Sequence, residues 1–386
     1  MNVGIFTNAY KPIISGVVNS IFLFKQGLTQ LGHNVYVFAP GFPGYKDDES
    51  HVYRFRSISI TQKVKFPLAI PLSNRIAKII PDMKLEIIHT QHPYILGEVG
   101  ASYAKKFKIP LVYTFHTQFE QYSHYIPFNQ DIVKMLARLS VINYTKKCDC
   151  IITPAPSIME LLKSYGIKQR VEVLPNAIDL SSFENPDRHM IRTKYSIGHN
   201  DTVLINVGRL GLEKNLAFML HAFKIITQKA HNVKLMIVGE GPEENALKDL
   251  ASEIGLGKKV IFTGRIDYHE IPYYYGAADI FIMTSVTEVK PLAILEAMAS
   301  GLPMVAVAAS GSSDTITSGL DGILTELNIE DFASETLKLI ENNDLRKKMG
   351  HHAKQTAAKY SIISTSKKLA QIYEDLIKTK HRKAKN

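Results

Sequence analysis

The most informative stretch of this chain is Ile280-Phe281-Ile282-Met283-Thr284-Ser285-Val286-Thr287-Glu288-Val289-Lys290-Pro291-Leu292-Ala293-Ile294-Leu295-Glu296-Ala297-Met298-Ala299-Ser300-Gly301. It starts with four apolar residues typical of a buried strand and continues through a polar loop into an apolar helical segment. Pro291 suits the first helical position, and Gly301 supplies the left-handed residue that ends many helices. The stretch predicts a strand, a loop and a helix of about ten residues, which is one unit of an α/β fold.

Two glutamates flank the start of the expected helix, with Glu288 just before it and Glu296 two turns inside. The unpaired N–H groups and the positive dipole end of a first helical turn suit an anion, while carboxylates accept hydrogen bonds from hydroxyls. A phosphorylated sugar offers both kinds of group. Two solvated glutamates in ordinary α/β architecture explain this stretch equally well.

A second loop carries the opposite charge. The apolar segment 203–207 runs into Gly208-Arg209-Leu210-Gly211-Leu212-Glu213-Lys214-Asn215-Leu216. Ligands collect at the carboxyl ends of parallel strands, where Arg209 offers a planar fork for phosphate oxygens and Lys214 a mobile point charge. Alone, this loop is explained as well by solvated cations. Together with the Glu288 loop it favours a cradle for a nucleotide diphosphate.

Short apolar segments alternate with helical stretches through both halves of the chain, as is typical of βαβ units and a mainly parallel sheet. The strands expected in the first half are 3–6, 35–38, 87–88, 111–113, 150–152 and 171–174, and those in the second half are 203–207, 235–238, 260–262, 280–283, 304–307 and 323–324.

The chain length calls for two domains. It has 386 residues, of which 45% are hydrophobic, and this exceeds what one hydrophobic core usually supports. A polar stretch with a proline at 179–187 is the expected linker. We therefore expect an N-terminal Rossmann-like domain at 1–185, a C-terminal Rossmann-like domain at 186–360, and a final helix with a basic tail at 361–386.

Several motifs, in order along most of the chain, resemble retaining glycosyltransferase family 4. They are Tyr10-Lys11-Pro12-Ile13-Ile14-Ser15-Gly16-Val17-Val18, Phe115-His116-Thr117, Pro175-Asn176-Ala177-Ile178-Asp179, Gly208-Arg209 with Lys214-Asn215, Val238-Gly239-Glu240-Gly241-Pro242-Glu243, Phe262-Thr263-Gly264-Arg265, and the two glutamates followed by Ala297-Met298-Ala299-Ser300-Gly301-Leu302-Pro303. The resemblance implies the GT-B fold, in which two Rossmann-like domains face a central cleft and the last helix crosses back to the first domain. Residues with the spacing for that contact are Leu369, Ile372, Tyr373, Leu376 and Ile377.

The resemblance also implies roles by position. Glu288 would hold hydroxyls of the donor sugar and Glu296 the ribose hydroxyls of the nucleotide. Arg209 and Lys214 would neutralise the diphosphate leaving group, and His116 would lie near the transferred sugar. The implied catalytic residues are His116, Arg209, Lys214 and Glu288; the implied donor-binding residues are Gly16, Val17, Gly208, Arg209, Lys214, Arg265, Ile266, Glu288, Lys290, Pro291, Leu292 and Glu296.

The chain departs from the family pattern at Pro291, where glycine is common. Proline has no N–H to donate, so one backbone contact to the donor is in question, although Lys290 and Leu292 keep theirs. A second departure, Ala177 in place of a frequent glycine, falls near the expected linker.

For the acceptor, His116-Thr117 with Tyr122-Ser123-His124-Tyr125 and a basic N-terminal half is similar to the diacylglycerol glucosyltransferases of this family. The implied reaction moves glucose from UDP-glucose to 1,2-diacylglycerol with retention of configuration. The alternatives are another lipid acceptor, as for a phosphatidylinositol mannosyltransferase, or a soluble saccharide. A glycoside hydrolase using two glutamates, a nucleotide-sugar epimerase and a non-catalytic nucleotide-sugar binder also remain open.

Positive charge is concentrated in three places, and the net charge is +10. Cations interleave with apolar residues in 51–80 and again in 132–139, and the tail 378–385 adds five more. Such interleaving suits an anionic lipid surface, which predicts a cytoplasmic protein bound peripherally to the inner face of the cell membrane. The alternative is a basic soluble surface whose apolar residues face the core.

Other classes are disfavoured. No apolar run reaches the length of a membrane span, no basic leader precedes the first strand, and no nucleic-acid motif is present. Cys148 and Cys150 are expected to be buried thiols. The turn Gly239-Glu240-Gly241 lacks the third glycine of a dinucleotide site. A metal site built from His89, His92, His116 and His124 lacks an accompanying Asp-x-Asp cluster, so no metal or other cofactor is expected.

Overall fold

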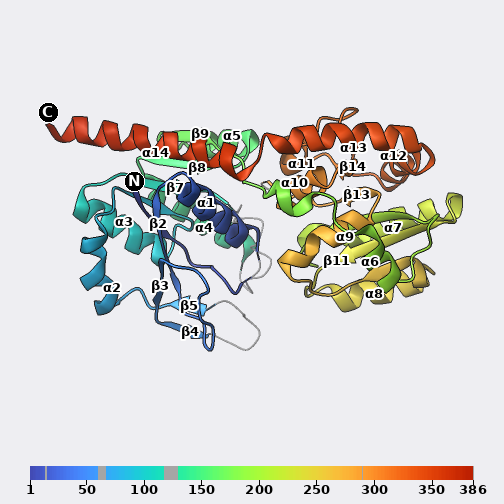
Figure 1. Ribbon diagram of the computed structural model, residues 1–386, viewed down its shortest axis with the longest axis horizontal. Coiled ribbons are helices and arrows are strands. Elements are labelled where there is room, and N and C mark those ends of the chain that lie inside the picture. The colour runs from blue at the N-terminus through green and yellow to red at the C-terminus, as the bar shows by residue number, and fades with distance from the viewer. Residues whose placement is uncertain (14, 60–66, 117–128, 289, 386) are drawn as a thin grey trace. The chain divides into compact units, whose positions relative to one another are not determined.

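The computed structural model describes residues 1–13, 15–59, 67–116, 129–288 and 290–385, and it forms two compact units that each contain a parallel sheet (Figure 1). One unit comprises Met1–Ala177 together with Ile362–Asn386, and the other comprises Ile178–Ser361. The expectation of two Rossmann-like units is confirmed.

The N-terminal unit has a seven-stranded sheet in the order β3-β2-β1-β6-β7-β8-β9, in which all neighbours are parallel. The edge strand β3 and the antiparallel hairpin β4–β5 were not expected from the sequence. The strands are β1 (Asn2–Phe6), β2 (Asn34–Pro40), β3 (Val52–Phe55), β4 (Ser57–Ser59), β5 (Pro67–Ala69), β6 (Ile87–Thr90), β7 (Leu111–Thr114), β8 (Cys150–Thr153) and β9 (Arg170–Val173).

Both faces of this sheet are covered because alternate residues of a strand point to opposite sides. Ile5 packs in a cluster with residues of α1 and α14, while the neighbouring Phe6 lies against Gly100 of α3. The helices are α1 (Gly16–Gln30), α2 (Asn74–Ile79), α3 (Leu96–Phe107), α4 (Gln130–Thr145), α5 (Pro156–Ser164) and α14 (Ile362–Lys385), with a 3-10 turn at Ile80–Met83.

The last helix, α14, belongs to the N-terminal unit, as expected from its apolar spacing (Figure 1). Leu369, Tyr373, Leu376 and Ile377 are buried against β1, β2 and α1. The Tyr373 hydroxyl lies 2.6 Å from Nδ1 of the buried His89. The helix therefore attaches through apolar packing and one buried polar contact.

The C-terminal unit has a six-stranded parallel sheet in the order β12-β11-β10-β13-β14-β15. Its strands are β10 (Thr202–Val207), β11 (Val233–Val238), β12 (Val260–Phe262), β13 (Ile280–Met283), β14 (Met304–Val307) and β15 (Gly322–Thr325). Its helices are α6 (Arg188–Lys194), α7 (Leu216–Lys229), α8 (Glu244–Glu253), α9 (Ile271–Ala277), α10 (Leu292–Ala299), α11 (Ser310–Ser313), α12 (Ile329–Glu341) and α13 (Asn343–Ala358), with 3-10 turns at Leu180–Phe183, Leu212–Lys214, Gly257–Lys259 and Tyr268–Glu270.

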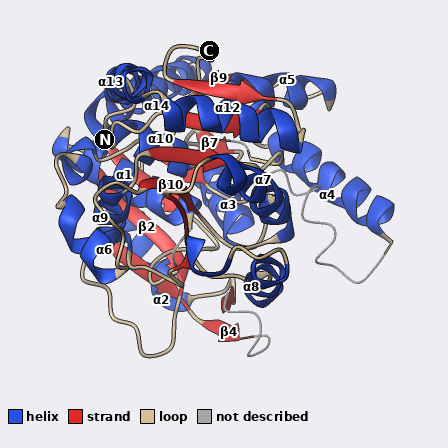
Figure 2. Cartoon of the chain, turned by 90° about the vertical axis from the view of Figure 1, so that its right-hand side faces the viewer, coloured by secondary structure: helices blue, strands red, loops and turns tan. Residues whose placement is uncertain are grey.

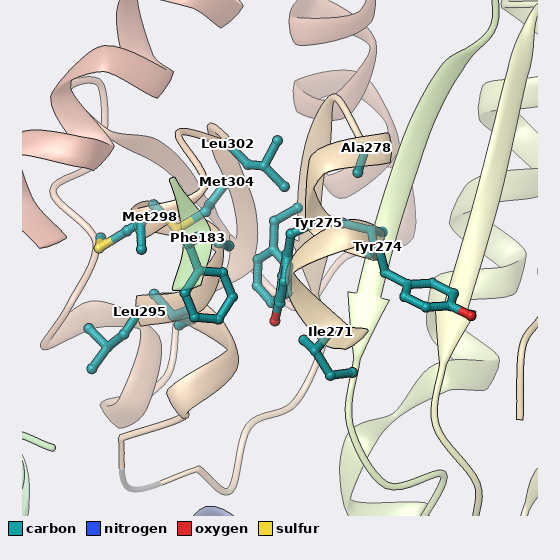
Figure 3. Packing of buried hydrophobic residues seen from close by; sticks show 14 of the residues in the cluster. Phe183, Ile271, Tyr274, Tyr275, Ala278, Leu295, Met298, Leu302 and Met304 are labelled. Atoms are coloured by element: carbon teal, nitrogen blue, oxygen red, sulfur yellow. The ribbon is translucent and has the colours of Figure 1, made fainter. Parts of the chain in front are cut away.

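One core cluster lies on each face of this second sheet. Leu204 and Ile282 pack with α7 and α12, whereas Ile205 and Phe281 pack with α9 and α10. Figure 3 shows the second cluster, in which Tyr275 lies beside Phe183 with ring centroids 5.9 Å apart. Helices thus cover both faces, which explains why these strands read as continuous apolar runs.

The division between the units falls between residues 177 and 178, whereas the sequence placed it between 185 and 186. The stretch expected to be a linker contains Phe183, which is only 1% exposed and packs in the C-terminal core (Figure 3). Because the stretch is mostly polar, the burial of this one apolar residue was not expected from the sequence. The second division, before Ile362, falls one residue after the expected start of the final segment.

The remaining expectations concern local features. Helix α10 has 8 residues, and Pro291 is its N-cap rather than its first helical residue. Cys148 and Cys150 are buried free thiols, as expected. Among the described residues, no helix combines the length and apolar character needed to cross a bilayer.

The contact between α1 and α14 gives a test of the fold. A Cβ atom on Gly27 would lie 2.1 Å from Ser366 Oγ and 2.7 Å from Ile362 Cγ2. We expect Gly27→Val to lower the free energy of unfolding by about 2 kcal/mol, since the two helices must separate. Urea titration followed by circular dichroism measures this. The control is Thr29→Val on the exposed side of α1, and equal stability of the two variants would contradict the packing.

Candidate active site

The candidate site of the C-terminal unit lies where β10 and β13 are neighbours. These strands pair in parallel although β11 and β12 lie between them in sequence, so the order of the sheet reverses here. In open α/β sheets, ligands bind beyond the carboxyl ends of the strands at such a switch point. The loop with Arg209 and Lys214 follows β10, and the loop with Glu288 follows β13.

Two hydroxyl groups that the sequence reasoning missed join these loops. Thr284 Oγ1 donates to the carbonyl oxygens of Lys214 and Asn215 at 3.0 and 3.1 Å, and Ser285 Oγ donates to the carbonyl of Glu213 at 3.0 Å. Both hydroxyl residues are buried. Their position directly after an apolar strand could have indicated a role at the carboxyl end of the sheet. The bonds fix the backbone that carries Lys214 relative to β13.

Lys214 and Glu288 form an ion pair between Nζ and Oε1. Their side chains are 24% and 20% exposed, so solvent reaches both. Lys214 extends past Gly208, where a Cβ would lie 3.7 Å from Lys214 Cε. The backbone of Glu288 is held from the other side, because Ser310 Oγ donates to its carbonyl at 3.3 Å. The structure therefore brings together two of the expected site residues.

Arg209 lies in the same loop as Lys214. It is 52% exposed, and Nη1 lies 4.0 Å from Oε1 of Glu213. Glu213 is buried, and its carboxylate occupies the space beside Gly211. The guanidinium is thus accessible at the edge of the loop, as a phosphate ligand would require.

Glu296 is buried inside α10, with 4% of its surface exposed. Oε2 accepts a hydrogen bond of 2.9 Å from the Tyr275 hydroxyl, and the Tyr268 hydroxyl is a second partner. Burial raises the pKa of Glu296 to about 7, and the hydrogen bonds from the two tyrosines oppose this rise. Sequence reasoning named the carboxylate but missed both tyrosines, which resemble ordinary core residues of α9 and the turn before it.

Two glycines allow neighbouring loops to pack backbone on backbone. A Cβ on Gly239 would lie 1.9 Å from the carbonyl oxygen of Gly208, and one on Gly241 would lie 2.2 Å from that of Leu210. Gly239 N–H also donates to the carbonyl of Gly264 at 3.1 Å. These glycines serve loop packing, which agrees with a strand-to-helix turn.

Arg265 and Ile266, two of the implied donor-binding residues, follow Gly264. Arg265 is exposed, with Nη1 3.9 Å from Oε1 of Glu240, whereas Ile266 packs partly buried against the core. The two side chains therefore have different surroundings. The group that both residues could offer to a ligand is their backbone.

Lys290 and Leu292, on either side of the N-cap Pro291, both bury their side chains. The side chain of Lys290 is buried, with Nζ 3.4 Å from the carbonyl of Asp314 and 4.8 Å from the centre of the Tyr360 ring. Burial lowers the pKa of Lys290 to about 8, against the opposing effect of Asp314. Leu292 is buried as well. Any contact of Lys290 with a donor must therefore come from its backbone.

In the N-terminal unit, the expected residues lie beyond the carboxyl ends of β1 and β7. Gly16 and Val17 begin α1, whose N-cap Ser15 accepts a hydrogen bond from Val18 N–H. His116 follows β7, and its Nε2 lies 2.6 Å from Oε1 of Gln91, a residue that sequence reasoning missed. Since an amide oxygen only accepts, the proton of the neutral ring is on Nε2.

Three buried or half-buried histidines of this unit, His89, His92 and His116, have lowered pKa values. Desolvation by burial, followed by the proximity of His92 and His89, lowers the pKa of His116 to about 3. Burial lowers the pKa of His92 to about 4 and that of His89 to about 3. Both ring nitrogens of His89 have partners, Tyr373 and Thr114. Residues 117–128 lie outside the described residues, and they include Thr117 and Tyr122, Ser123, His124 and Tyr125 of the expected acceptor motif.

Within the described part of the chain, no group of three or more His, Cys, Asp or Glu residues is arranged to hold a metal ion.

Comparison with known proteins assigns the chain to a family. The family model described as "Glycosyltransferase Family 4" matches residues 14–182, and the model described as "Glycosyl transferases group 1" matches residues 187–356. The chain belongs to the glycosyltransferases of family 4, and it is an enzyme with the GT-B fold.

Individual relatives are similar over most of their length. The alpha-monoglucosyldiacylglycerol synthase of Streptococcus pneumoniae (strain ATCC BAA-255 / R6) is 34% identical over 79% of this chain and 71% of its own. A protein of the same name from Acholeplasma laidlawii is 29% identical over 99% of each chain. The structure of Anabaena Alr3699/HepE in complex with UDP shares the fold, with a TM-score of 0.79, 19% identity and coverage of 97% of this chain and 100% of that one.

The buried carboxylate of Glu296 makes stability depend on pH. Its folded-state pKa of about 7 lies above the unfolded value of 4.5, so the unfolded chain releases this proton first as pH rises. Burial of Glu296 therefore has no pH-dependent effect on stability below about pH 4.5. As the pH rises from there to about 7, it lowers the free energy of unfolding by on the order of 3 kcal/mol. We expect Glu296→Gln to melt several degrees above the wild type at pH 8.

Melting curves between pH 5 and pH 8 test this expectation, and the gap between variant and wild type should narrow as the pH falls. Glu244→Gln provides the control, since Glu244 pairs with Lys248 on the surface of α8. A Glu296→Gln protein that melts below the wild type at pH 8 would show that the carboxylate stabilises the fold.

Proposed function

We propose that this enzyme transfers glucose from UDP-glucose to 1,2-diacylglycerol, with retention of configuration, at the surface of an anionic membrane. The observation that carries the donor chemistry is the pair of Lys214 and Glu288 at the switch point of the C-terminal sheet. An ammonium group suits a diphosphate, and a carboxylate suits sugar hydroxyls. The names of the two relatives support glucose and diacylglycerol.

The reaction needs stabilisation of a leaving group more than it needs a strong acid. The bond between the anomeric carbon and the phosphate oxygen breaks, and the nucleoside diphosphate leaves with the electron pair. Arg209 and Lys214 are the cations proposed to stabilise this charge, since preorganised charges aimed at the developing anion lower the barrier most. Glu288 orients the sugar through its hydroxyls.

Retention follows from the anomers involved. UDP-glucose carries an α-linked glucose, and the relatives' name specifies an alpha product. A new bond on the same face is accounted for if the departing phosphate takes the proton of the acceptor hydroxyl. His116 is neutral, with its proton on Nε2, so Nδ1 has a lone pair that can accept a hydrogen bond from a sugar hydroxyl.

Helix α4 supplies the strongest physical argument for a lipid surface. Its side chains Ile132, Met135, Leu136 and Leu139 follow helical spacing and are each between 42% and 56% exposed. The same helix exposes Lys134 and Arg138. In Figure 2, α4 extends away from β7 of its own sheet. An apolar stripe flanked by cations suits the interface of an anionic bilayer.

The hairpin region offers a second apolar surface. Ile58, Ile70 and Leu72 are exposed, and Arg56, Arg75 and Lys78 are exposed nearby in sequence. Two residues counted in the basic stretch have other roles, because Arg54 pairs with Asp47 and Phe55 is buried. Lys63, Lys65 and Phe66 lie outside the described residues. Among the described cations of this stretch, Arg54 is therefore engaged within the protein.

The donor assignment predicts selective loss of turnover. Lys214→Ala removes a cation beside the leaving group and Glu288→Ala removes a sugar contact, so each should lower kcat by about 100-fold or more without unfolding the protein. The assay is product formation from UDP-glucose and diacylglycerol vesicles, with the linkage determined by NMR. Lys347→Ala on the exposed face of α13 is the control. Wild-type activity in either site variant would remove that residue from the mechanism.

The membrane assignment predicts separate effects of charge and apolar area. Lys134→Glu should weaken binding to vesicles containing anionic lipid by roughly tenfold or more and leave binding to neutral vesicles unchanged. Met135→Ser with Leu136→Ser should weaken both. Co-sedimentation measures binding, and Leu320→Ser with Leu327→Ser in the C-terminal unit is the control. An enzyme indifferent to all vesicles would favour a soluble saccharide acceptor.

A further inference from the structure

The ion pair between Lys214 and Glu288 joins two groups that are each proposed to bind a different part of the donor. Lys214 comes from the loop after β10 and Glu288 from the loop after β13. In this structure each side chain is the charged partner of the other. A donor that uses both groups must therefore separate them.

The backbones on both sides of the pair are fixed, so the exchange requires movement of side chains alone. Thr284 holds the carbonyl of Lys214, and Ser310 holds the carbonyl of Glu288. Gly311 lies against Glu288, since a Cβ there would be 2.7 Å from the Glu288 carbonyl oxygen. Gly208 has no side chain beside the Lys214 ammonium group, and a Cβ there would lie 3.8 Å from Nζ.

We propose that this ion pair makes the site select a nucleotide sugar over the corresponding nucleoside diphosphate; the proposal rests on the function proposed above. A diphosphate that binds Lys214 displaces the Glu288 carboxylate. The displaced carboxylate then lies near phosphate charges of the same sign, which is unfavourable unless new hydrogen bonds compensate it. A sugar attached to the diphosphate supplies those bonds through its hydroxyls. A nucleoside diphosphate does not.

The same exchange assists turnover. Once the sugar has been transferred, the leaving group keeps its contact with Lys214, but Glu288 has lost its hydroxyl partners. Re-formation of the ion pair then competes with the diphosphate for the ammonium group. The pair therefore weakens product binding more than donor binding, which limits product inhibition.

A purely structural role makes a different prediction. An ion pair with about a fifth of each side chain exposed contributes little to stability, as most such pairs do. If the pair only joined two loops, removing the carboxylate would either leave nucleotide binding unchanged or weaken it by loosening the site. Tighter binding of a nucleoside diphosphate is expected only if the carboxylate competes for Lys214.

Isothermal titration calorimetry of the full-length protein with UDP and with UDP-glucose tests the proposal. Glu288→Gln keeps the shape of the side chain and removes its charge. We expect this variant to bind UDP about 10-fold more tightly than the wild type. We also expect the ratio of UDP to UDP-glucose dissociation constants to fall by about 10-fold or more. Glu288→Ala, which removes the same charge, should likewise tighten UDP binding.

The control is Glu244→Gln, which removes a carboxylate from the surface pair with Lys248 and should change neither dissociation constant. Circular dichroism confirms the fold of each variant. UDP affinity of both Glu288 variants that is weaker than that of the wild type, or within twofold of it, overturns the selectivity role. A wild-type protein that gives no heat with UDP-glucose contradicts the proposed donor instead, and GDP-mannose with GDP then repeats the test of the ion pair.

Discussion

Parallel pairing of β10 with β13 is the constraint on which the C-terminal site depends. Because these strands are neighbours, the loops that follow them meet at one edge of the sheet, although about 70 residues separate Lys214 from Glu288. The hydroxyls of Thr284 and Ser285 then bind carbonyl groups of the first loop. Backbone topology thus brings opposite charges together, and buried hydrogen bonds set their spacing.

Glu296 shows a conflict between stability and function in the same unit. A buried carboxylate is unfavourable, and two tyrosine hydroxyls only partly compensate for its burial. An apolar residue at this position would make the C-terminal unit more stable. Under the proposed function, this acid would bind ribose hydroxyls, and functional sites commonly keep locally unfavourable residues.

The sequence was most informative about strands and about charged loops. Strands of both sheets are buried on two faces, so they appear as short apolar runs with helices between them. The edge strand β3 was missed because residues 51–80 were interpreted by their charge, and Arg54 in fact pairs with Asp47. The unit boundary was displaced because one residue, Phe183, packs in the core from within a polar stretch.

Within the site, single residues of unusual chemistry were predictable and their partners were not. Lys214 and Glu288 stand out because charges follow apolar strands, but nothing in the sequence indicates that they contact each other. Tyr268, Tyr275 and Gln91 look like ordinary core or loop residues, and only the fold places them beside Glu296 or His116. Contacts between residues far apart in sequence depend on topology, which local patterns do not specify.

Pro291 illustrates how a departure from a family pattern can be absorbed by the fold. It occupies the N-cap of α10, with a φ of −68°, so the ring fits the backbone without strain. The missing N–H belongs to a position just outside the helix, and the first-turn N–H groups of the helix itself begin at Leu292. The preceding residue, Lys290, turns its side chain inward onto Asp314 and Tyr360. An anion near the helix start would therefore meet backbone donors of α10, and under the proposed function Arg209 and Lys214 would supply the charge for the diphosphate.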